Sequence, residues 1–498
     1  MIRTRIAPSP TWAMHIWTAR AALFNYLFAK QNNWKFLIRI EDTDKERSLQ
    51  KYTEEILKWL DWLGFKPDED VVYQSKNEKK HIEAINFLLE NNYAYYAYET
   101  MEELQKMKEK AQIEKKTFIY RQINYTQEQL EQFKKEWRKP VVRFKLPDEK
   151  LAYDDLTKWN ISFDIKNVSD FVIQKSDGSP IFYIANVVDD HIMWITHVIR
   201  WEDHISNTPK QILLYRALWY DLPYFWHLPL LLNSNRSKMS KRDTSDVFVT
   251  VKKFMQEWFL KQAVINFIAL LWWHTADDRE IFTMDEILKE FSPDRVQSSN
   301  AVYDFQRAIW FNGEHIRALN DDEFIQNIKE YVNTLLYDDV FKTEDQELLA
   351  KLKYWEQIIK GWKLDNEAYN KKWIKEIKVR LQTLKQFVLY NEYLFDYVQV
   401  SQDVLYNKKM KVSEEIVKTH IQALIENLEK LENWNEEVLK DIIITYNKEN
   451  GLKNWQTLWP IRAILSWVQA SPWAFELMVI LWKIETIKRL KNFISELD

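Results

Sequence analysis

Two short segments combine residue types that suit a phosphate ligand. The first runs Ser9-Pro-Thr-Trp-Ala-Met-His15-Ile-Trp17-Thr18, at a turn between a predicted strand and a predicted helix. A helix N-terminus presents N–H groups that favour an anion, and His15 is placed to donate to a phosphate oxygen. A single histidine near a helix start is more often structural than catalytic, so this segment alone leaves both interpretations open.

The second segment is Lys238-Met-Ser-Lys241-Arg242, which places three cations and a hydroxyl within five residues. These groups suit a polyphosphate whose charge moves in the transition state. Alone, a short basic run usually indicates a solvated loop. The two segments together, in this order and about 220 residues apart, are a much more specific signal.

The pair resembles the HIGH and KMSKS signatures of class I aminoacyl-tRNA synthetases. Other sequence segments narrow the resemblance to bacterial-type glutamyl-tRNA synthetases. These segments are Arg5-Ile-Ala-Pro-Ser-Pro, Arg39-Ile-Glu-Asp-Thr-Asp, Asn186-Val-Val-Asp-Asp-His191 and Glu202-Asp-His-Ile-Ser-Asn-Thr. The similarity extends from residue 1 to about 320 and resumes at 451–462. Glutaminyl-tRNA synthetases are similar but carry different text after the first strand.

The resemblance implies an ATP site, with His15, Lys238 and Lys241 as catalytic residues that stabilise charge on the α-phosphate. The ATP-binding residues that it implies are His15, Trp17, Thr18, Lys238, Met239, Ser240 and Lys241. Mg²⁺ is expected to bridge the phosphates and keep several waters, so no protein ligand to the metal is predicted.

The resemblance also implies a site for L-glutamate. Arg5 and Arg200 match the positions that hold the side-chain carboxylate, which a guanidinium grips bidentately, and a structural ion pair is the alternative role. Glu41 matches the carboxylate that receives the ammonium group, and Ser9 and Asn186 match further polar contacts. Phe182 stands where the family has a pocket tyrosine, which puts that hydroxyl in doubt.

Strand and helix patterns indicate the elements that must position these residues. Residues 4–7 and 35–40 read as strands, 15–31 and 44–63 as helices, and 196–200 as a further strand. This alternation predicts a parallel sheet with its site at the strand carboxyl ends. Strands are also expected over 141–146, 161–164 and 171–175, and helices from about 315 onward.

The expected fold is therefore an α/β Rossmann-type class I synthetase catalytic domain with an inserted α+β domain that binds the acceptor stem. An all-α C-terminal region that binds the anticodon follows. By resemblance, the catalytic domain takes residues 1–83 and 187–240, and the insertion takes 84–186. A KMSKS-loop and stem-contact domain takes 241–315, and the anticodon-binding domain takes 316–498.

Composition excludes several classes of protein. The chain has 498 residues and a net charge of −4, unlike a general, strongly basic nucleic-acid binder. It has no cysteine, so disulfides and Cys-based zinc sites are excluded, and no zinc is expected where some family members bind it. The longest apolar run, 263–273, is too short to span a membrane. A cytoplasmic monomer that binds tRNA(Glu), L-glutamate and ATP is expected.

Glycine and tryptophan usage is abnormal, with 5 glycines and 24 tryptophans. Average usage predicts roughly 35 glycines in this length. Sixteen tryptophans stand where the family text has glycine: Trp12, Trp17, Trp34, Trp59, Trp137, Trp159, Trp194, Trp201, Trp219, Trp226, Trp258, Trp272, Trp455, Trp467, Trp473 and Trp482. Because some bacterial lineages read UGA as glycine, translation under a code that reads it as tryptophan is one hypothesis. If the tryptophans are real, ATP binding is expected to be blocked.

Three functions follow from these observations. The first is ATP-dependent ligation of glutamate to the 3′ end of tRNA(Glu) through a glutamyl-adenylate. The second is a catalytically silent tRNA-binding paralogue, for which Trp17 is the support. The third is glutaminyl-tRNA synthetase activity, which a charging assay with the other amino acid separates.

Overall fold

The computed structural model forms two compact units, Met1–Lys253 with Lys261–Arg307, and Phe254–Leu260 with Ala308–Asp498. The structure describes residues 2–11, 14–31, 33–43, 50–233, 236–237, 250–361, 372–397, 400, 405–406, 412–467 and 471–497. Lys238, Met239, Ser240 and Lys241 of the second phosphate segment therefore lie outside the described residues.

The first unit is built on parallel strands. β1 (Arg3–Ile6), β2 (Lys35–Ile40) and β3 (Val72–Tyr73) form one parallel sheet. β9 (His197–Trp201) and β10 (Tyr224–Leu228) pair in parallel in a second sheet. The Thr196 N–H donates to the Arg3 carbonyl (3.0 Å), which links the start of β9 to the start of β1. Five of the six residues of β2 are buried, as expected for a parallel strand covered on both faces.

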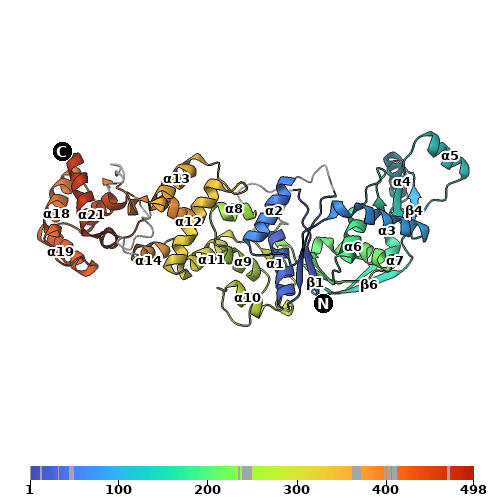
Figure 1. Ribbon diagram of the computed structural model, residues 1–498, viewed down its shortest axis with the longest axis horizontal. Coiled ribbons are helices and arrows are strands. Elements are labelled where there is room, and N and C mark those ends of the chain that lie inside the picture. Colours follow the sequence, from blue (N-terminus) through green and yellow to red (C-terminus); the bar gives the residue numbers. More distant parts are fainter. Residues whose placement is uncertain are drawn as a thin grey trace. The chain divides into compact units, whose positions relative to one another are not determined.

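Helices cover these strands. α1 (Ile16–Lys30) follows β1 through the Pro-rich turn and packs on it (Figure 1). α6 (Phe182–Ile192) and α7 (Thr208–Ala217) pack against each other, and Pro209 in the first turn of α7 suits a helix start. α2 (Gln50–Trp62) lies within the predicted 44–63 helix, whose first six residues lie outside the described residues.

The middle of the first unit carries a second layer of strands. β4 (Ala94–Ala97), β5 (Val141–Phe144) and β8 (Phe171–Gln174) form an antiparallel sheet near α3 (Glu78–Glu90), α4 (Met101–Ile113) and α5 (Gln127–Lys135). β6 (Lys150–Asp155) forms a hairpin with β7 (Trp159–Asp164) and also pairs with β10. The hairpin therefore extends the sheet of β9 and β10, and its first strand was not among the predicted ones.

The remaining helices of the two units confirm a helical C-terminal part. The described residues of the second unit from 308 onward hold helices and no strand. The first unit also holds two short paired strands, β11 (Leu231–Leu232) and β12 (Ala301–Val302). The remaining α-helices of the described residues are α8 (Val251–Gln256), α9 (Lys261–Leu270), α10 (Met284–Glu290), α11 (Phe305–Ala318), α12 (Asp321–Tyr337), α13 (Gln346–Lys360), α14 (Lys372–Lys378), α15 (Leu384–Tyr390), α17 (Glu414–Ile416), α18 (Gln422–Glu429), α19 (Glu436–Glu449), α20 (Trp455–Ser466) and α21 (Ala474–Leu497). No helix in the described part of the chain is long and apolar enough to cross a membrane.

Candidate active site

The carboxyl ends of β1 and β2 place two arginines on one aspartate of α6. The Arg5 guanidinium donates to both oxygens of Asp190, through Nε (2.8 Å) and Nη2 (3.1 Å). Arg39 Nη1 donates to the same carboxylate (2.5 Å). All three side chains are buried. Burial favours the neutral acid, but the charges of Arg39 and Arg5 outweigh it and hold the pKa of Asp190 below its usual range.

Glu41, one residue past the end of β2, faces the same cluster. Its carboxylate accepts from the Asn186 amide (2.7 Å), from Arg39 Nη2 (3.3 Å) and from the Ser9 hydroxyl (3.5 Å). Burial raises the pKa of Glu41, and the neighbouring Arg39 and Arg5 oppose that rise. Three predicted site residues from separate segments, Ser9, Glu41 and Asn186, therefore meet.

Arg200 lies on β9 and differs from Arg5 and Arg39 in its partners. Its Nε donates to His227 Nε2 (3.2 Å) and its Nη2 to the Thr208 hydroxyl (2.8 Å). In the described part of the chain, no carboxylate lies within ion-pair distance of this buried guanidinium. Burial, with Arg5 nearby, lowers the pKa of Arg200 to about 10. The arrangement therefore offers a buried cation to an incoming carboxylate.

His227 itself is held by a carboxylate. Its Nδ1 lies 2.6 Å from an oxygen of Asp155, at the end of β6. Burial lowers the pKa of His227, so the ring is neutral near pH 7. Because Asp155 accepts at Nδ1, the proton resides there and Nε2 is left as the acceptor for Arg200. Asp155, His227 and Arg200 thus form a hydrogen-bonded chain that orients the guanidinium.

Two side chains of α7 complete this cluster. The Tyr215 hydroxyl is buried without a hydrogen-bond partner among the described residues. Burial raises the pKa of Tyr215, and Asp190, Arg5, Arg39 and Arg200 are close enough to influence it. Gln211 reaches Asn186 (3.4 Å). A buried hydroxyl without a partner is unusual and suits a site that binds a polar ligand.

Phe182 begins α6 and is partly buried. Its ring centroid lies 5.7 Å from that of His204. The neighbouring hydroxyl, on Tyr183, donates to Asn207 (3.3 Å) and accepts from Lys210 (3.2 Å). Tyr183 is thereby bonded to α7 and the segment before it.

His15 is the N-cap residue of α1, as the first phosphate segment predicted, and its side chain is buried. Thr18 lies in the first turn of the same helix and is half-buried. The Trp17 ring packs on His15, with centroids 4.3 Å apart, and on Trp201 at 6.4 Å. The indole of Trp17 therefore fills the space beside the helix N-terminus.

Comparison with known proteins places this geometry in a family. Residues 1–310 match the family model described as tRNA synthetases class I (E and Q), catalytic domain, and residues 324–494 match an anticodon binding domain. Glutamate–tRNA ligase 1 of Caldanaerobacter subterraneus is 36% identical, over 100% of this chain and 98% of that relative. The Bacillus subtilis glutamate–tRNA ligase is 34% identical, over 99% of each chain. The chain belongs to the glutamate–tRNA ligase family of class I synthetases.

The solved structures agree with this assignment. A glutamate tRNA ligase from Elizabethkingia meningosepticum, described as in complex with its amino acid, aligns with a TM-score of 0.80 and 28% identity over 100% of both chains. The expected fold of this synthetase is confirmed: a class I catalytic domain is followed by a mostly helical anticodon-binding domain.

Several residues of the cluster were not predicted as site residues from the sequence of this synthetase. They are Arg39, Asp155, Asp190, Thr208, Gln211, Tyr215 and His227. Arg39 and Asp190 lie in sequence segments that resemble the family, so the resemblance could have identified them. The sequence gives no comparable indication for His227 and Asp155, because their relation to Arg200 depends on strand pairing between β6, β9 and β10.

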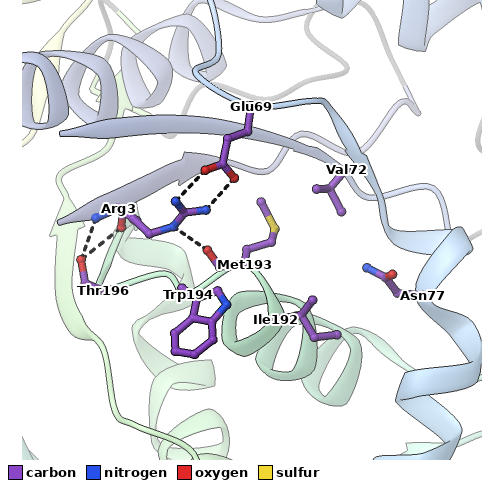
Figure 2. Close-up of a pocket in the computed structure, with 8 residues that line it drawn as sticks. All are labelled: Arg3, Glu69, Val72, Asn77, Ile192, Met193, Trp194 and Thr196. Carbon is purple, nitrogen blue, oxygen red and sulfur yellow. Dashed lines mark hydrogen bonds and ion pairs between the residues drawn. The ribbon is translucent and has the colours of Figure 1, made fainter. Parts of the chain in front are cut away.

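A separate pocket of about 720 Å³ lies at the other end of the strands. Figure 2 shows it lined by Arg3, Glu69 and Trp194, with Arg3 paired to Glu69. Arg3 begins β1, and Thr196 in the same wall precedes β9. Ligands of open α/β sheets bind at the carboxyl ends of strands, so this pocket is set apart from the cluster above.

The described residues of this synthetase contain no group of three or more His, Cys, Asp or Glu side chains placed to hold a metal ion. The absence of zinc therefore remains a prediction from the sequence.

Proposed function

We propose that this synthetase ligates L-glutamate to the 3′ end of tRNA(Glu), using ATP and passing through a glutamyl-adenylate. The observation that carries the amino-acid specificity is Arg200, a buried guanidinium whose described partners are His227 and Thr208. Relatives named glutamate–tRNA ligase over the full length support the reaction.

In this proposal the substrate side-chain carboxylate binds Arg200, with Arg5 nearby. A neutral glutamine side chain would leave the buried charge unpaired, and such discrimination is typically large. Glu41 receives the substrate ammonium group, with Ser9 and Asn186 beside it.

ATP binds at the N-terminus of α1, where His15, Trp17 and Thr18 lie. Lys238, Met239, Ser240 and Lys241 are proposed to close on the phosphates. Mg²⁺, when bound, would supply positive charge that stabilises the phosphate oxygens. Catalysis then rests on positioning and charge stabilisation, without a covalent enzyme intermediate.

The tRNA is proposed to contact residues 84–186 with its acceptor end, 241–315 with its stem, and 316–498 with its anticodon. Phosphate contacts and splayed anticodon bases would supply the affinity. A cytoplasmic, monomeric enzyme is part of the proposal.

The test is a charging assay on two forms of the chain. One has the printed sequence, and the other has the sixteen tryptophans named above replaced by glycine. The proposal is supported if the glycine form, with or without the printed form, charges tRNA with glutamate and not with glutamine. Charging with glutamine instead overturns it in favour of a glutaminyl enzyme.

A catalytically silent tRNA-binding protein is the second candidate, because the Trp17 indole packs on His15 at the nucleotide turn. It predicts tRNA binding by both forms, with no glutamate-dependent consumption of ATP by either. That result would withdraw the roles assigned to His15, Lys238 and Lys241.

A further inference from the structure

Backbone conformation sets seven of the described tryptophans of this chain apart from the rest. These seven have a positive φ, between 50° and 61°: Trp137, Trp159, Trp194, Trp219, Trp258, Trp467 and Trp482. In this region the Cβ atom crowds the neighbouring carbonyl, so bulky residues rarely adopt it and glycine does so freely. Asn33, Asn92, Lys115 and Arg236 are the only other described non-glycine residues with a positive φ.

Four of the seven end a helix in the hydrogen-bond pattern that favours glycine, and sometimes asparagine, over a bulky residue. The Trp137 N–H donates to the Lys134 carbonyl (3.1 Å), and the next N–H, of Arg138, donates to Phe133 (3.0 Å). This is the Schellman pair, with Trp137 at the left-handed position. The same pair of bonds occurs at Trp194, Trp219 and Trp258.

Two glycines of this chain occupy the same position, as do Asn33, Asn92 and Lys115. The Gly64 N–H donates to Asp61 (2.9 Å) and the following N–H, of Phe65, donates to Leu60 (2.8 Å), with a φ of +83° at Gly64. Gly451 ends α19 with the same pair of bonds and a φ of +67°. Tryptophan and glycine therefore occupy one structural role within a single chain.

Two further positions are equally specific. Trp159 begins β7 just after the turn of the β6–β7 hairpin, where a residue with positive φ is usually glycine. Trp482 interrupts α21 with a φ of 61° and a ψ of 167°. That combination lies in a region adopted essentially by glycine alone.

Packing recovers little at four of the seven positions, whereas Trp258 is 2% exposed and packs on Tyr331. The side chains of Trp137, Trp159, Trp194 and Trp219 are 72–89% exposed. An indole in solvent recovers little hydrophobic energy, so at these four positions little offsets the cost of the backbone conformation, although the Trp219 ring contacts Phe87. In Figure 2 the Trp194 ring forms one wall of the pocket at the start of β1, which makes that pocket partly a product of the indole.

A second group comprises the described tryptophans outside the sixteen positions where the family resemblance implies glycine. None of Trp62, Trp273, Trp310, Trp355, Trp373, Trp434 and Trp459 has a positive φ. The indole N–H groups of Trp355 and Trp434 donate to the carbonyls of Val388 and Met478, each at 2.8 Å. All seven strained tryptophans belong to the sixteen positions where the family resemblance implies glycine, and none of this second group does. The other described members of the sixteen have no positive φ.

We infer that the functional protein carries glycine at these seven positions, and at the other family glycine positions read by the same codon. One consequence rests on the proposed function. Trp201 and Trp272 stack on Arg20, with its Cζ 5.0 Å and 3.2 Å from their ring centroids, and Trp17 packs on His15. Glycine at these three positions would free the space beside His15 and the buried Arg20 for the nucleotide.

The decisive test needs no enzymatic activity. Peptide mass spectrometry of the protein purified from the cells that produce it, together with the codons of its gene, gives the residue at each position. We expect glycine, encoded by UGA, at the seven positions. At Trp355 and Trp434 we expect tryptophan, encoded by UGG. Tryptophan in the peptides that contain the seven positions overturns the inference, whatever the charging assay shows.

Stability of the recombinant chain gives an independent test. Trp137→Gly and Trp194→Gly are each expected to raise Tm by about 2–4 °C, because each relieves a left-handed tryptophan. Trp310→Gly is the matched control, since Trp310 is 41% exposed inside α11 and lacks a positive φ, and it should lower Tm. Equal losses of Tm in all three variants would contradict the conformational argument.

Discussion

The Asn186 amide of α6 donates to the Glu41 carboxylate across 2.7 Å, although 145 residues separate them. The contact fixes the carboxylate that is proposed to hold the substrate ammonium group. Glu41→Gln should raise KM for glutamate roughly 10- to 100-fold, because a charge-assisted hydrogen bond contributes about 1.5–3 kcal/mol. Steady-state charging at saturating ATP and tRNA measures this. An unchanged KM would place the ammonium elsewhere.

The same carboxylate predicts a pH dependence. Burial raises the pKa of Glu41 despite the opposing charges of Arg39 and Arg5. The ammonium requires the ionised form, so affinity for glutamate should fall as the pH drops through that raised pKa. Calorimetric titration of glutamate across the acidic range measures the effect. In Glu41→Gln the affinity should be weak, and the acid-dependent step due to Glu41 should be absent.

The family resemblance implied Arg5, Ser9, Glu41, Asn186 and Arg200 as one site, and the structure brings them together at the carboxyl ends of β1, β2 and β9. The strand pattern predicted only where such a site would lie, since the carboxyl ends of parallel strands meet at one edge. It did not find Asp190 as the partner of Arg5, because no spacing rule links positions 185 residues apart.

The missed strand β6 has a different cause. Its burial alternates strictly from Lys150 to Asp155, which a period-two pattern can reveal. The prediction treated these residues as a connection within an insertion. Their pairing with β10 is tertiary information, and it is this pairing that carries Asp155 to His227.

Removing the Asp190 charge should destabilise the fold. Asp190→Asn leaves the buried Arg5 and Arg39 without their shared carboxylate, and loss of one partner from a buried pair typically costs about 3–5 kcal/mol. Urea unfolding at pH 7 measures the free energy. The control is Glu69→Gln, whose pairs with Arg3 and Lys35 are more exposed and should contribute about 1 kcal/mol or less.

The pH dependence of that stability follows from linkage. The pKa of Asp190 is held below its usual range by Arg39 and Arg5, against the effect of burial. Its contribution is therefore full above the unfolded-state pKa and is lost as the pH falls through the lower folded-state pKa. The acid-induced loss of stability should shrink in Asp190→Asn. If both proteins lose the same unfolding free energy as the pH falls, that loss is due to other carboxylates.

His15→Ala tests the nucleotide site in the form that carries the sixteen glycines. If His15 stabilises charge on the phosphates, kcat for charging should fall about 10²- to 10³-fold, as for loss of one transition-state donor. Binding of glutamate alone should be unaffected, since the described contacts of the glutamate cluster do not include His15. His191→Asn is the control, because His191 stacks on Tyr220 at the surface. Loss of glutamate binding in His15→Ala would indicate a structural role instead.

The chain of Asp155, His227 and Arg200 predicts a positioning role that substrate kinetics can separate from simple stability. His227→Gln should raise KM for glutamate roughly tenfold and leave KM for ATP unchanged, since one hydrogen bond from the charged Arg200 is worth about 1.5 kcal/mol. Asp155→Asn should act in the same direction, because it removes the acceptor that keeps the proton on Nδ1.

The pH profile of His227→Gln also separates a positioning role of His227 from an effect on the stability of the fold. Burial lowers the pKa of His227, and protonation at low pH would turn Nε2 from an acceptor into a donor facing Arg200. Affinity for glutamate should therefore lose one acid-dependent step in His227→Gln while the step due to Glu41 remains. If both kcat and every KM change in parallel with Tm, His227 acts only through the stability of the fold.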